Sequence, residues 1–334
     1  MRWVRIANRG LSTRVCIPFG DAITQQRKAF ALANLLVRSY YGVTLYLLAN
    51  RLNIWADWLV LKEISPIWPI VWVNLTGISV AVHVIMGTSL VAAFLTLLFP
   101  EKRVLRILLF VSLLEYVAFS NSFGKINHDW HNWLMVAFFF IFLPHGRQEQ
   151  IKRSITRRQL YLTAFWGAQL SALAFYSLSG VWKVVVGGSQ LLRGEVHAFS
   201  PDALAYHIAN RLLQTNSPSM MGSFIVEHPL VGWPMYLGII YVQLFAFVAA
   251  FRPSLHRLWG GALICFHLGS YFTMSINFPQ NILLLVLFFI SSPFSPQSYH
   301  LSTILGDLPL IGWALKRAFG IFELPRRDCS KAAG

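Results

Sequence analysis

The residues best suited to chemistry are ionisable side chains in apolar surroundings, where a charge is costly unless it is paired or faces a cavity. The densest group is the run Asn127-His128-Asp129-Trp130-His131, which opens an apolar segment. His128 and His131 are three residues apart and share one helix face, which permits a metal ion between them. Polar capping of a helix start explains Asn127 and Asp129 but not the two histidines. Because the chain has no second histidine cluster of this kind, we expect no metal site.

Two more candidates lie in later apolar segments. Lys183 follows residues 176–182 near the outer end of one segment, and His267 lies in the middle of another. Lys183 is either an interfacial lysine that snorkels to the headgroups or a base, the role open to an amine held neutral in a low-dielectric site. No snorkelling can bring His267 to water. We therefore expect His128, Lys183 and His267 to face one cavity.

An arginine and a glutamate occur at matching depths. Arg38 lies nine residues beyond the inner start of the first apolar segment, and Glu115 lies eleven beyond that of the third. At a rise of about 1.5 Å per residue these depths agree within about 3 Å. We expect a structural salt bridge between the two side chains.

The composition indicates that the helices carrying these candidate residues lie in a membrane. The 334 residues are 56% hydrophobic and 12% charged, whereas soluble domains contain about 25% charged residues. We expect a basic N-terminal segment (1–28), one transmembrane domain (29–297) and an amphipathic cytoplasmic tail (298–334). The arginines and lysines of residues 1–28 leave no apolar stretch for a cleavable signal peptide, so the first membrane helix should direct insertion.

A bilayer core of about 30 Å is crossed by about 20 apolar residues. The sequence predicts an all-α, polytopic membrane helix bundle with eight spans. They run approximately Ala29–Asn50, Thr76–Leu98, Val104–Phe123, Asp129–Pro144, Leu160–Val185, Leu230–Phe251, Leu258–Ser275 and Asn281–Phe294.

The basic residues predict the orientation. With both termini in the cytoplasm, 21 Lys and Arg residues lie on the inner side and six on the outer side, as the positive-inside rule requires. The formal charge of +15 follows from this asymmetry, and no basic stripe suggests a nucleic-acid partner. The three cysteines match no zinc or haem spacing.

Two segments outside the spans are amphipathic. Leu204, Ile208 and Leu212 recur every four residues after Pro201 and predict a helix on the outer surface that covers a cavity. The segment from Ile304 to Phe322 is expected to lie on the inner surface.

Four motifs in one order resemble the transmembrane HTTM domain of the vitamin K-dependent gamma-carboxylases. The motifs are Asn127-His128, Ser179-Gly180-Val181-Trp182-Lys183, Phe266-His267 and Ser291-Ser292-Pro293-Phe294. The first span, in which Arg38 precedes Tyr41-Gly42, also resembles the opening helix of that domain. The resemblance covers roughly residues 25 to 298.

The resemblance implies roles for the matching residues. Lys183 matches the lysine that deprotonates vitamin K hydroquinone, whose reaction with O2 then gives a base strong enough for glutamyl carboxylation by CO2. His128 and His267 match polar residues of that pocket and are assigned with Lys183 to catalysis. Asn127, His131 and Trp182 are assigned to cofactor binding. The implied cofactor is vitamin K hydroquinone or menaquinol, with O2 and CO2 as co-substrates.

The expected function is quinol-dependent modification, including gamma-glutamyl carboxylation, of an exported peptide or small molecule. The site would lie on the outer side of a bacterial plasma membrane.

The carboxylases carry a large luminal domain after the membrane part, whereas about 36 residues follow the last span here, and Val184 to Gly194 lacks an expected tryptophan. The competing hypothesis is a non-catalytic HTTM protein that acts as a maturation partner of an exported peptide or binds a lipid or quinone. A transporter would need two related halves with broken helices, which the sequence lacks.

Cysteine labelling tests the orientation. In a variant without native cysteines, a cysteine at position 125 should react with an impermeant maleimide added from the outer side. A cysteine at position 153 should react only after permeabilisation, because it lies in a basic inner segment. The reverse pattern would show that the orientation and the outer location of the candidate site are wrong.

Overall fold

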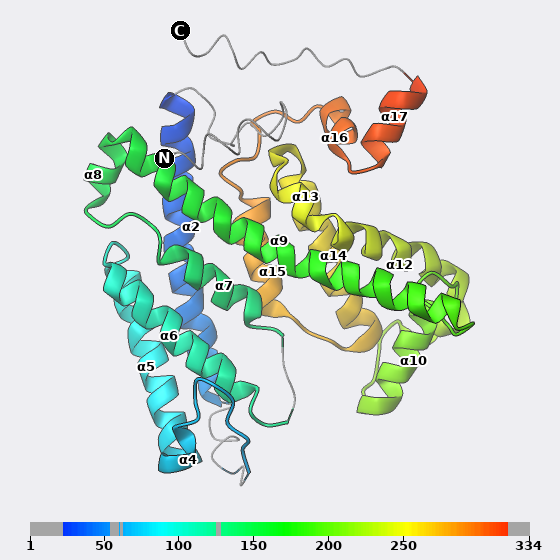
Figure 1. The fold of residues 1–334 in the computed structure, drawn as a ribbon, viewed down its shortest axis with the longest axis horizontal. Coiled ribbons are helices and arrows are strands. Elements are labelled where there is room, and N and C mark those ends of the chain that lie inside the picture. The colour runs from blue at the N-terminus through cyan, green and yellow to red at the C-terminus, as the bar shows by residue number, and fades with distance from the viewer. Residues whose placement is uncertain (1–22, 54–59, 61–62, 125–127, 320–334) are drawn as a thin grey trace. The chain divides into compact units, whose positions relative to one another are not determined.

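The computed structural model describes residues 23–53, 60, 63–124 and 128–319. Their regular secondary structure is helical and no strand occurs among them, which confirms the all-α prediction (Figure 1). The chain forms two compact units, an N-terminal unit described from residue 23 to 172 and a C-terminal unit from 173 to 319. The boundary falls inside the longest helix, α9 (Ile155–Leu192).

The N-terminal unit is built around an aromatic centre on its first helix. Its helices are α2 (Ile23–Asn50), α4 (Val73–Thr76), α5 (Ile78–Leu98), α6 (Arg103–Ser120), α7 (His131–Phe140), α8 (Gln148–Arg153) and the first half of α9. α2 packs along α5, α5 pairs with α6, and α6 contacts α7. The rings of Tyr40 and Trp133 stack at 4.8 Å, and Phe140 meets Tyr40 edge-on. Trp133 Nε1 donates to Thr44 Oγ1 (2.8 Å) and the Tyr40 hydroxyl donates to the Trp133 carbonyl (2.7 Å), so these buried rings have hydrogen-bond partners.

The C-terminal unit contains the predicted amphipathic helix. Its helices after α9 are α10 (Ala203–Thr215), α11 (Gly222–Glu227), α12 (Pro229–Leu244), α13 (Ala246–Ala250), η1 (Pro253–Leu255), α14 (His256–Met274), α15 (Pro279–Leu285), the π-helix η2 (Val286–Ile290), α16 (Leu301–Asp307) and α17 (Ile311–Phe319). Leu204 and Ile208 of α10 are buried against Tyr236 and Ile240 of α12, with Val184 of α9 packed beside them. The helical periodicity of this segment therefore predicted both its structure and its buried face.

The amphipathic tail is divided into two helices. α16 ends at Asp307 and α17 begins at Ile311, because Pro309 has no N–H to continue the helix and Leu310 has a φ of 58°. Gly312 allows the two helices to pack closely, since a Cβ there would lie 2.5 Å from the Gly306 carbonyl oxygen.

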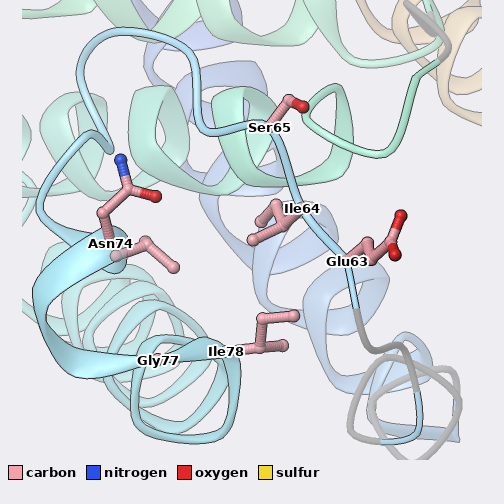
Figure 2. A pocket seen from close by; sticks show the side chains of 7 residues that line it. Glu63, Ile64, Ser65, Asn74, Gly77 and Ile78 are labelled. Carbon is pink, nitrogen blue, oxygen red and sulfur yellow. The ribbon is translucent and has the colours of Figure 1, made fainter.

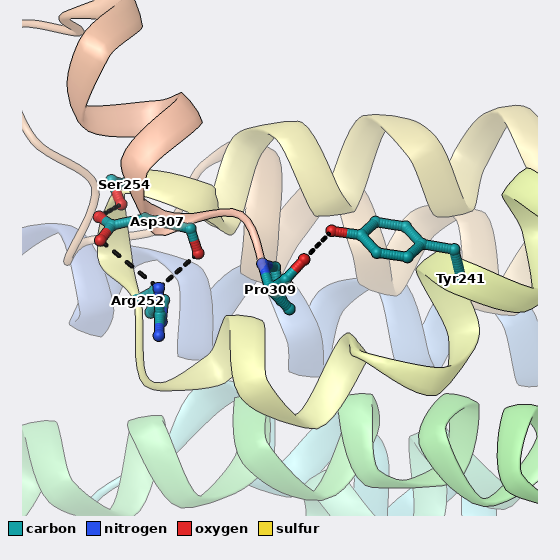
Figure 3. A network of polar contacts seen from close by, with 5 residues as sticks. All are labelled: Tyr241, Arg252, Ser254, Asp307 and Pro309. Carbon is teal, nitrogen blue, oxygen red and sulfur yellow. Dashed lines mark hydrogen bonds and ion pairs between the residues drawn. The ribbon is translucent and has the colours of Figure 1, made fainter. Parts of the chain in front are cut away.

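A polar network attaches this tail to the rest of the C-terminal unit (Figure 3). Arg252 Nη1 lies 3.6 Å from Asp307 Oδ1 and donates to the Asp307 carbonyl at 2.5 Å. Ser254 Oγ donates to Asp307 Oδ2 (2.5 Å), and the Tyr241 hydroxyl donates to the Pro309 carbonyl (2.7 Å). The end of α16 is thus held by the segment that joins α12 to α14.

Within residues 23–53, 60, 63–124 and 128–319, two helices are long and apolar enough to cross a membrane. α5 has 21 residues with a mean hydropathy of 2.1, and α9 has 38 residues with a mean hydropathy of 1.4 in its most apolar window. Only 39% and 28% of those windows are buried within the protein. They match the predicted second and fifth spans. The other six spans stay predictions, and α7, α12 and Pro279–Ile290 are shorter than a full crossing.

The predicted salt bridge between Arg38 and Glu115 is wrong. With the Gln148 amide oriented to accept, Arg38 Nη2 and Nε donate to its oxygen at 2.7 and 3.0 Å. Neither ion pair in the described part of the chain includes Glu115. The residue count gave the wrong depth for Arg38 because α2 is displaced along its axis relative to α5. A Cβ at Gly42 would contact Leu97, near the C-terminal end of α5, so Arg38, one turn before Gly42, lies toward or beyond that end.

The contact between α9 and the end of α12 gives a stability test. A Cβ at Gly180 would lie 2.4 Å from the Leu244 amide nitrogen, so the backbones must separate in Gly180→Ala. We expect a loss of about 1–3 kcal/mol in the free energy of unfolding. The control is Gly188→Ala on the same helix, where the added methyl meets nothing within 4 Å and helix propensity improves by up to about 1 kcal/mol. Thermal unfolding in detergent should separate the two variants, and equal midpoints would contradict the close contact.

Candidate functional site

One face of α9 carries the polar residues around Lys183. Tyr176, Ser179 and Lys183 occur at positions i, i+3 and i+7 and therefore share a helix face. Lys183 Nζ donates to Ser179 Oγ at 2.9 Å in a partly buried position. Neither of the two ion pairs among the described residues involves Lys183. The amine is therefore oriented by a hydroxyl and not by a carboxylate.

The same face reaches His267 on α14. The Tyr176 hydroxyl and His267 Nε2 share a buried hydrogen bond of 2.7 Å, and His267 is 4% exposed. The ring of Phe278 packs against His267 with centroids 5.4 Å apart. The remaining ring nitrogen, Nδ1, is buried without a hydrogen-bond partner. His267 thus has one nitrogen held by Tyr176 and one buried nitrogen without a partner.

Sequence reasoning missed His207, which lies close enough to Lys183 for their charges to interact. The rings of His207 on α10 and Tyr236 on α12 have centroids 5.7 Å apart. Burial lowers the pKa of the His207 imidazole, and the nearby positive charge of Lys183 lowers it further. The available signal was the spacing of His207, three residues after the buried Leu204 on the same helix, although His207 itself is exposed. Lys183 therefore lies close to a second nitrogen base, the His207 imidazole.

Trp182 lies on a different side of α9 from Lys183. Its side chain is 69% exposed, because neighbouring residues of a helix are separated by about 100° around its axis. Its assignment to cofactor binding stays a prediction.

The histidines of residues 127–131 belong to the N-terminal unit. The rings of His128 and His131 have centroids 5.0 Å apart, with His131 at the first position of α7. Asp129 pairs with Arg51 at 3.3 Å and so attaches the start of α7 to the end of α2. No group of three or more His, Cys, Asp or Glu side chains that could hold a metal ion occurs among the described residues. Asn127 lies outside those residues.

Lys183 and His267 are brought onto one helix face of the C-terminal unit, through Ser179 and Tyr176 respectively. His128 and His131 belong to the other unit. A cavity shared by His128, Lys183 and His267 therefore stays a prediction.

A pocket in the N-terminal unit contains none of these residues. It has a volume of about 590 Å³ and is lined by Glu63, Ile64, Ser65, Val73, Asn74, Gly77 and Ile78. Figure 2 shows Ile64 and Ile78 at its centre, while the carboxylate of Glu63 points away from them. Because its polar groups do not converge, it does not compete with the α9 face as a candidate site.

The hydrogen bond between Tyr176 and His267 can be tested by substitution. Tyr176→Phe leaves both buried ring nitrogens of His267 without a partner, which should cost about 1–3 kcal/mol of stability. Tyr271→Phe on α14 is the control, because the Tyr271 side chain is exposed. Combining Tyr176→Phe with His267→Phe should cost less than the sum of the single losses, since it removes both polar partners. Additive losses in denaturant titrations would show that the pair does not interact.

Comparison of the chain with known proteins finds no relative. No family model, no curated protein and no solved structure matches the chain. The function is therefore argued from the polar face of α9.

Proposed function

We propose that this chain is a multi-pass membrane enzyme of the gamma-carboxylase-like HTTM class. It would use Lys183 as the base in quinol-dependent modification of an exported peptide or small molecule. The observation that carries the proposal is the polar face of α9, where Tyr176 binds His267 and Ser179 binds Lys183. Acid-base groups are thereby concentrated on one of the two helices that are long and apolar enough to cross a membrane.

The membrane location is supported by the apolar side chains that α9 leaves exposed. Leu178, Trp182 and Leu192 are 66%, 69% and 90% exposed. A core helix of a soluble protein buries such side chains, whereas lipid accommodates them without cost. Together with the charge asymmetry of the sequence, these exposed surfaces favour a multi-pass arrangement in a plasma membrane with cytoplasmic termini.

The residues present fit a quinol in two respects. An amine without a counter-ion is costly as ammonium in apolar surroundings, so Lys183 is suited to accept a proton from a hydroxyl. His267 Nδ1 is buried without a partner and could bind a ring oxygen. When bound, a quinol supplies the acidic hydroxyl and, with O2, the oxidative chemistry that the carboxylases couple to CO2 addition.

The chain's own residues then have defined tasks. Ser179 Oγ accepts a hydrogen bond from Lys183 Nζ and fixes the direction of the amine lone pair. After Lys183 takes up a proton, the same Ser179 oxygen can continue to accept from the ammonium. Tyr176 fixes the His267 ring through Nε2 and leaves Nδ1 free to orient a substrate oxygen. α10 covers this part of the C-terminal unit and brings His207 close to Lys183.

Substitution of Lys183 separates a base from an interfacial anchor. An anchor needs only a positive charge, so Lys183→Arg should be silent in that role. A base needs a neutral amine, which an arginine with a pKa above about 12 cannot supply. We expect Lys183→Arg and Lys183→Ala to leave the protein folded but to abolish conversion of added quinol, measured by chromatography of the quinone products. The exposed Lys102 provides the control variant Lys102→Arg, which should keep full activity.

The activity of Lys183→Arg tests whether Lys183 is the base, and the activity of the wild type tests whether the protein is an enzyme. Full activity in Lys183→Arg would show that Lys183 is not the base. A wild-type protein that binds quinol and never converts it would support the non-catalytic alternative, a lipid- or quinone-binding partner in the maturation of an exported peptide.

A further inference from the structure

The last described helix, α17, exposes large apolar side chains next to an arginine. Leu310, directly before the helix, and Trp313 are 64% and 63% exposed, and Ala314 and Arg317 are exposed as well. We call Leu310, Trp313, Ala314 and Arg317 the tail face. None of these four residues belongs to the polar face of α9 that carries Lys183.

Helix geometry directs the tail face away from α16. Gly312 lies against α16, since a Cβ there would be 2.5 Å from the Gly306 carbonyl oxygen. Positions 313, 314 and 317 are rotated from Gly312 by about 100°, 200° and 140° around the helix axis, so they point away from that contact. The guanidinium carbon of Arg317 lies 5.4 Å from the centre of the Trp313 ring, a cation–π arrangement. The arginine and the tryptophan therefore present one combined surface.

The rest of the C-terminal unit holds the tail in place. Arg252 pairs with Asp307 at the end of α16 (Figure 3), and the guanidinium carbon of Arg257 lies 5.2 Å from the centre of the Tyr299 ring. The charge asymmetry predicts that the segment with Arg252 and Arg257 is on the inner side. These contacts thus join two segments that are both predicted to lie on the cytoplasmic side.

The charge of the tail indicates what covers its face. In the sequence, no acidic residue occurs between Asp307 and Glu323, whereas Lys316 and Arg317 lie in that interval. A second copy of this chain would bring the same positive charge to the contact and be repelled. An anionic lipid surface attracts it, and the inner leaflet of a plasma membrane carries such lipids.

The side chains of the tail face match the layers of a lipid surface. Tryptophan rings are enriched at the headgroup level, and interfacial helices combine buried apolar side chains with basic ones. We propose that the tail face docks on anionic phospholipids of the inner leaflet, with Leu310 and Trp313 among the upper acyl chains and Arg317 at the phosphates. This inference rests on the membrane location in the proposed function and not on its quinol chemistry.

The test uses the full chain in nanodiscs with a fluorescent probe on a single cysteine. Ala314→Cys, in a variant without native cysteines, places the probe on the tail face at a small exposed side chain. Lipids brominated near the top of the acyl chains quench the probe when the tail face docks. We expect strong quenching in discs that contain phosphatidylglycerol. Quenching should be weak in discs of phosphatidylcholine alone and should fall at high salt, which screens exposed charges.

Matched variants measure the contribution of each side chain to the docking equilibrium constant, obtained from the quenched fraction. Arg317→Gln should lower it about fivefold, the equivalent of about 1 kcal/mol for one basic side chain at an anionic surface. Arg153→Gln, which removes an exposed charge from another predicted inner segment, should leave it unchanged. Trp313→Ala should lower it at least fivefold, because the largest apolar side chain of the tail face is lost. Trp68→Ala is the control, since Trp68 is similarly exposed but predicted on the outer side.

The remaining outcomes would overturn the proposal. Equal quenching in discs with and without phosphatidylglycerol would show apolar insertion without recognition of anionic lipid. An effect of Arg317→Gln no larger than that of Arg153→Gln would show that Arg317 is not at the phosphates. An unquenched probe that instead transfers energy between copies would show that a second chain covers the tail face.

The docking measurement is independent of the quinol assay. The substituted side chains are exposed, so the variants should fold, which thermal unfolding in detergent verifies. Docking by a protein that never converts quinol would support the tail proposal and contradict the proposed enzyme. Quinol conversion by a protein whose tail does not dock would have the opposite meaning.

Discussion

The cost of a charged side chain in apolar surroundings determines where the ionic groups of this protein lie and which helices they join. Two ion pairs occur in the described part of the chain: Arg51 pairs with Asp129 at 3.3 Å, and Arg252 pairs with Asp307 at 3.6 Å. Each pair joins segments far apart in sequence, so charge neutralisation also fixes the packing of helix ends. Lys183 has no carboxylate partner within the described residues, and the proposed function starts from this amine.

α9 contributes both a close packing contact and polar side chains within the same stretch. Ser177 Oγ accepts from the Phe247 amide at 2.7 Å, and the absence of a side chain at Gly180 lets the α12 backbone approach. This contact supports the break between α12 and α13, whose free backbone groups Ser177 satisfies. The neighbouring positions Tyr176, Ser179 and Lys183 are thereby fixed on the polar face of α9. The packing contact at Gly180 and the acid-base groups thus belong to the same two helical turns, since Gly180 lies four residues after Tyr176 and three before Lys183.

Sequence reasoning succeeded where a local period carries the information. The spacing of Leu204 and Ile208 predicted α10, and the apolar lengths of two segments predicted α5 and α9. It failed where the answer depends on contacts between distant segments. The partner of His267 is Tyr176, 91 residues earlier, and no pattern in the sequence joins them. The pairing of Arg38 with Glu115 failed because residue counts assume that helices start level, whereas α2 is displaced along α5.

The network around Asp307 has a consequence for the order in which the protein assembles on the ribosome. Arg252 and Tyr241 emerge before α16 is synthesised, so their partners Asp307 and Pro309 do not yet exist. Until then the turn between α13 and α14 carries a cation without its counter-ion, and α12 carries a phenol without its acceptor. Because chains fold progressively from the N-terminus during synthesis, these contacts of the C-terminal unit form only after residues 301–309 have been translated.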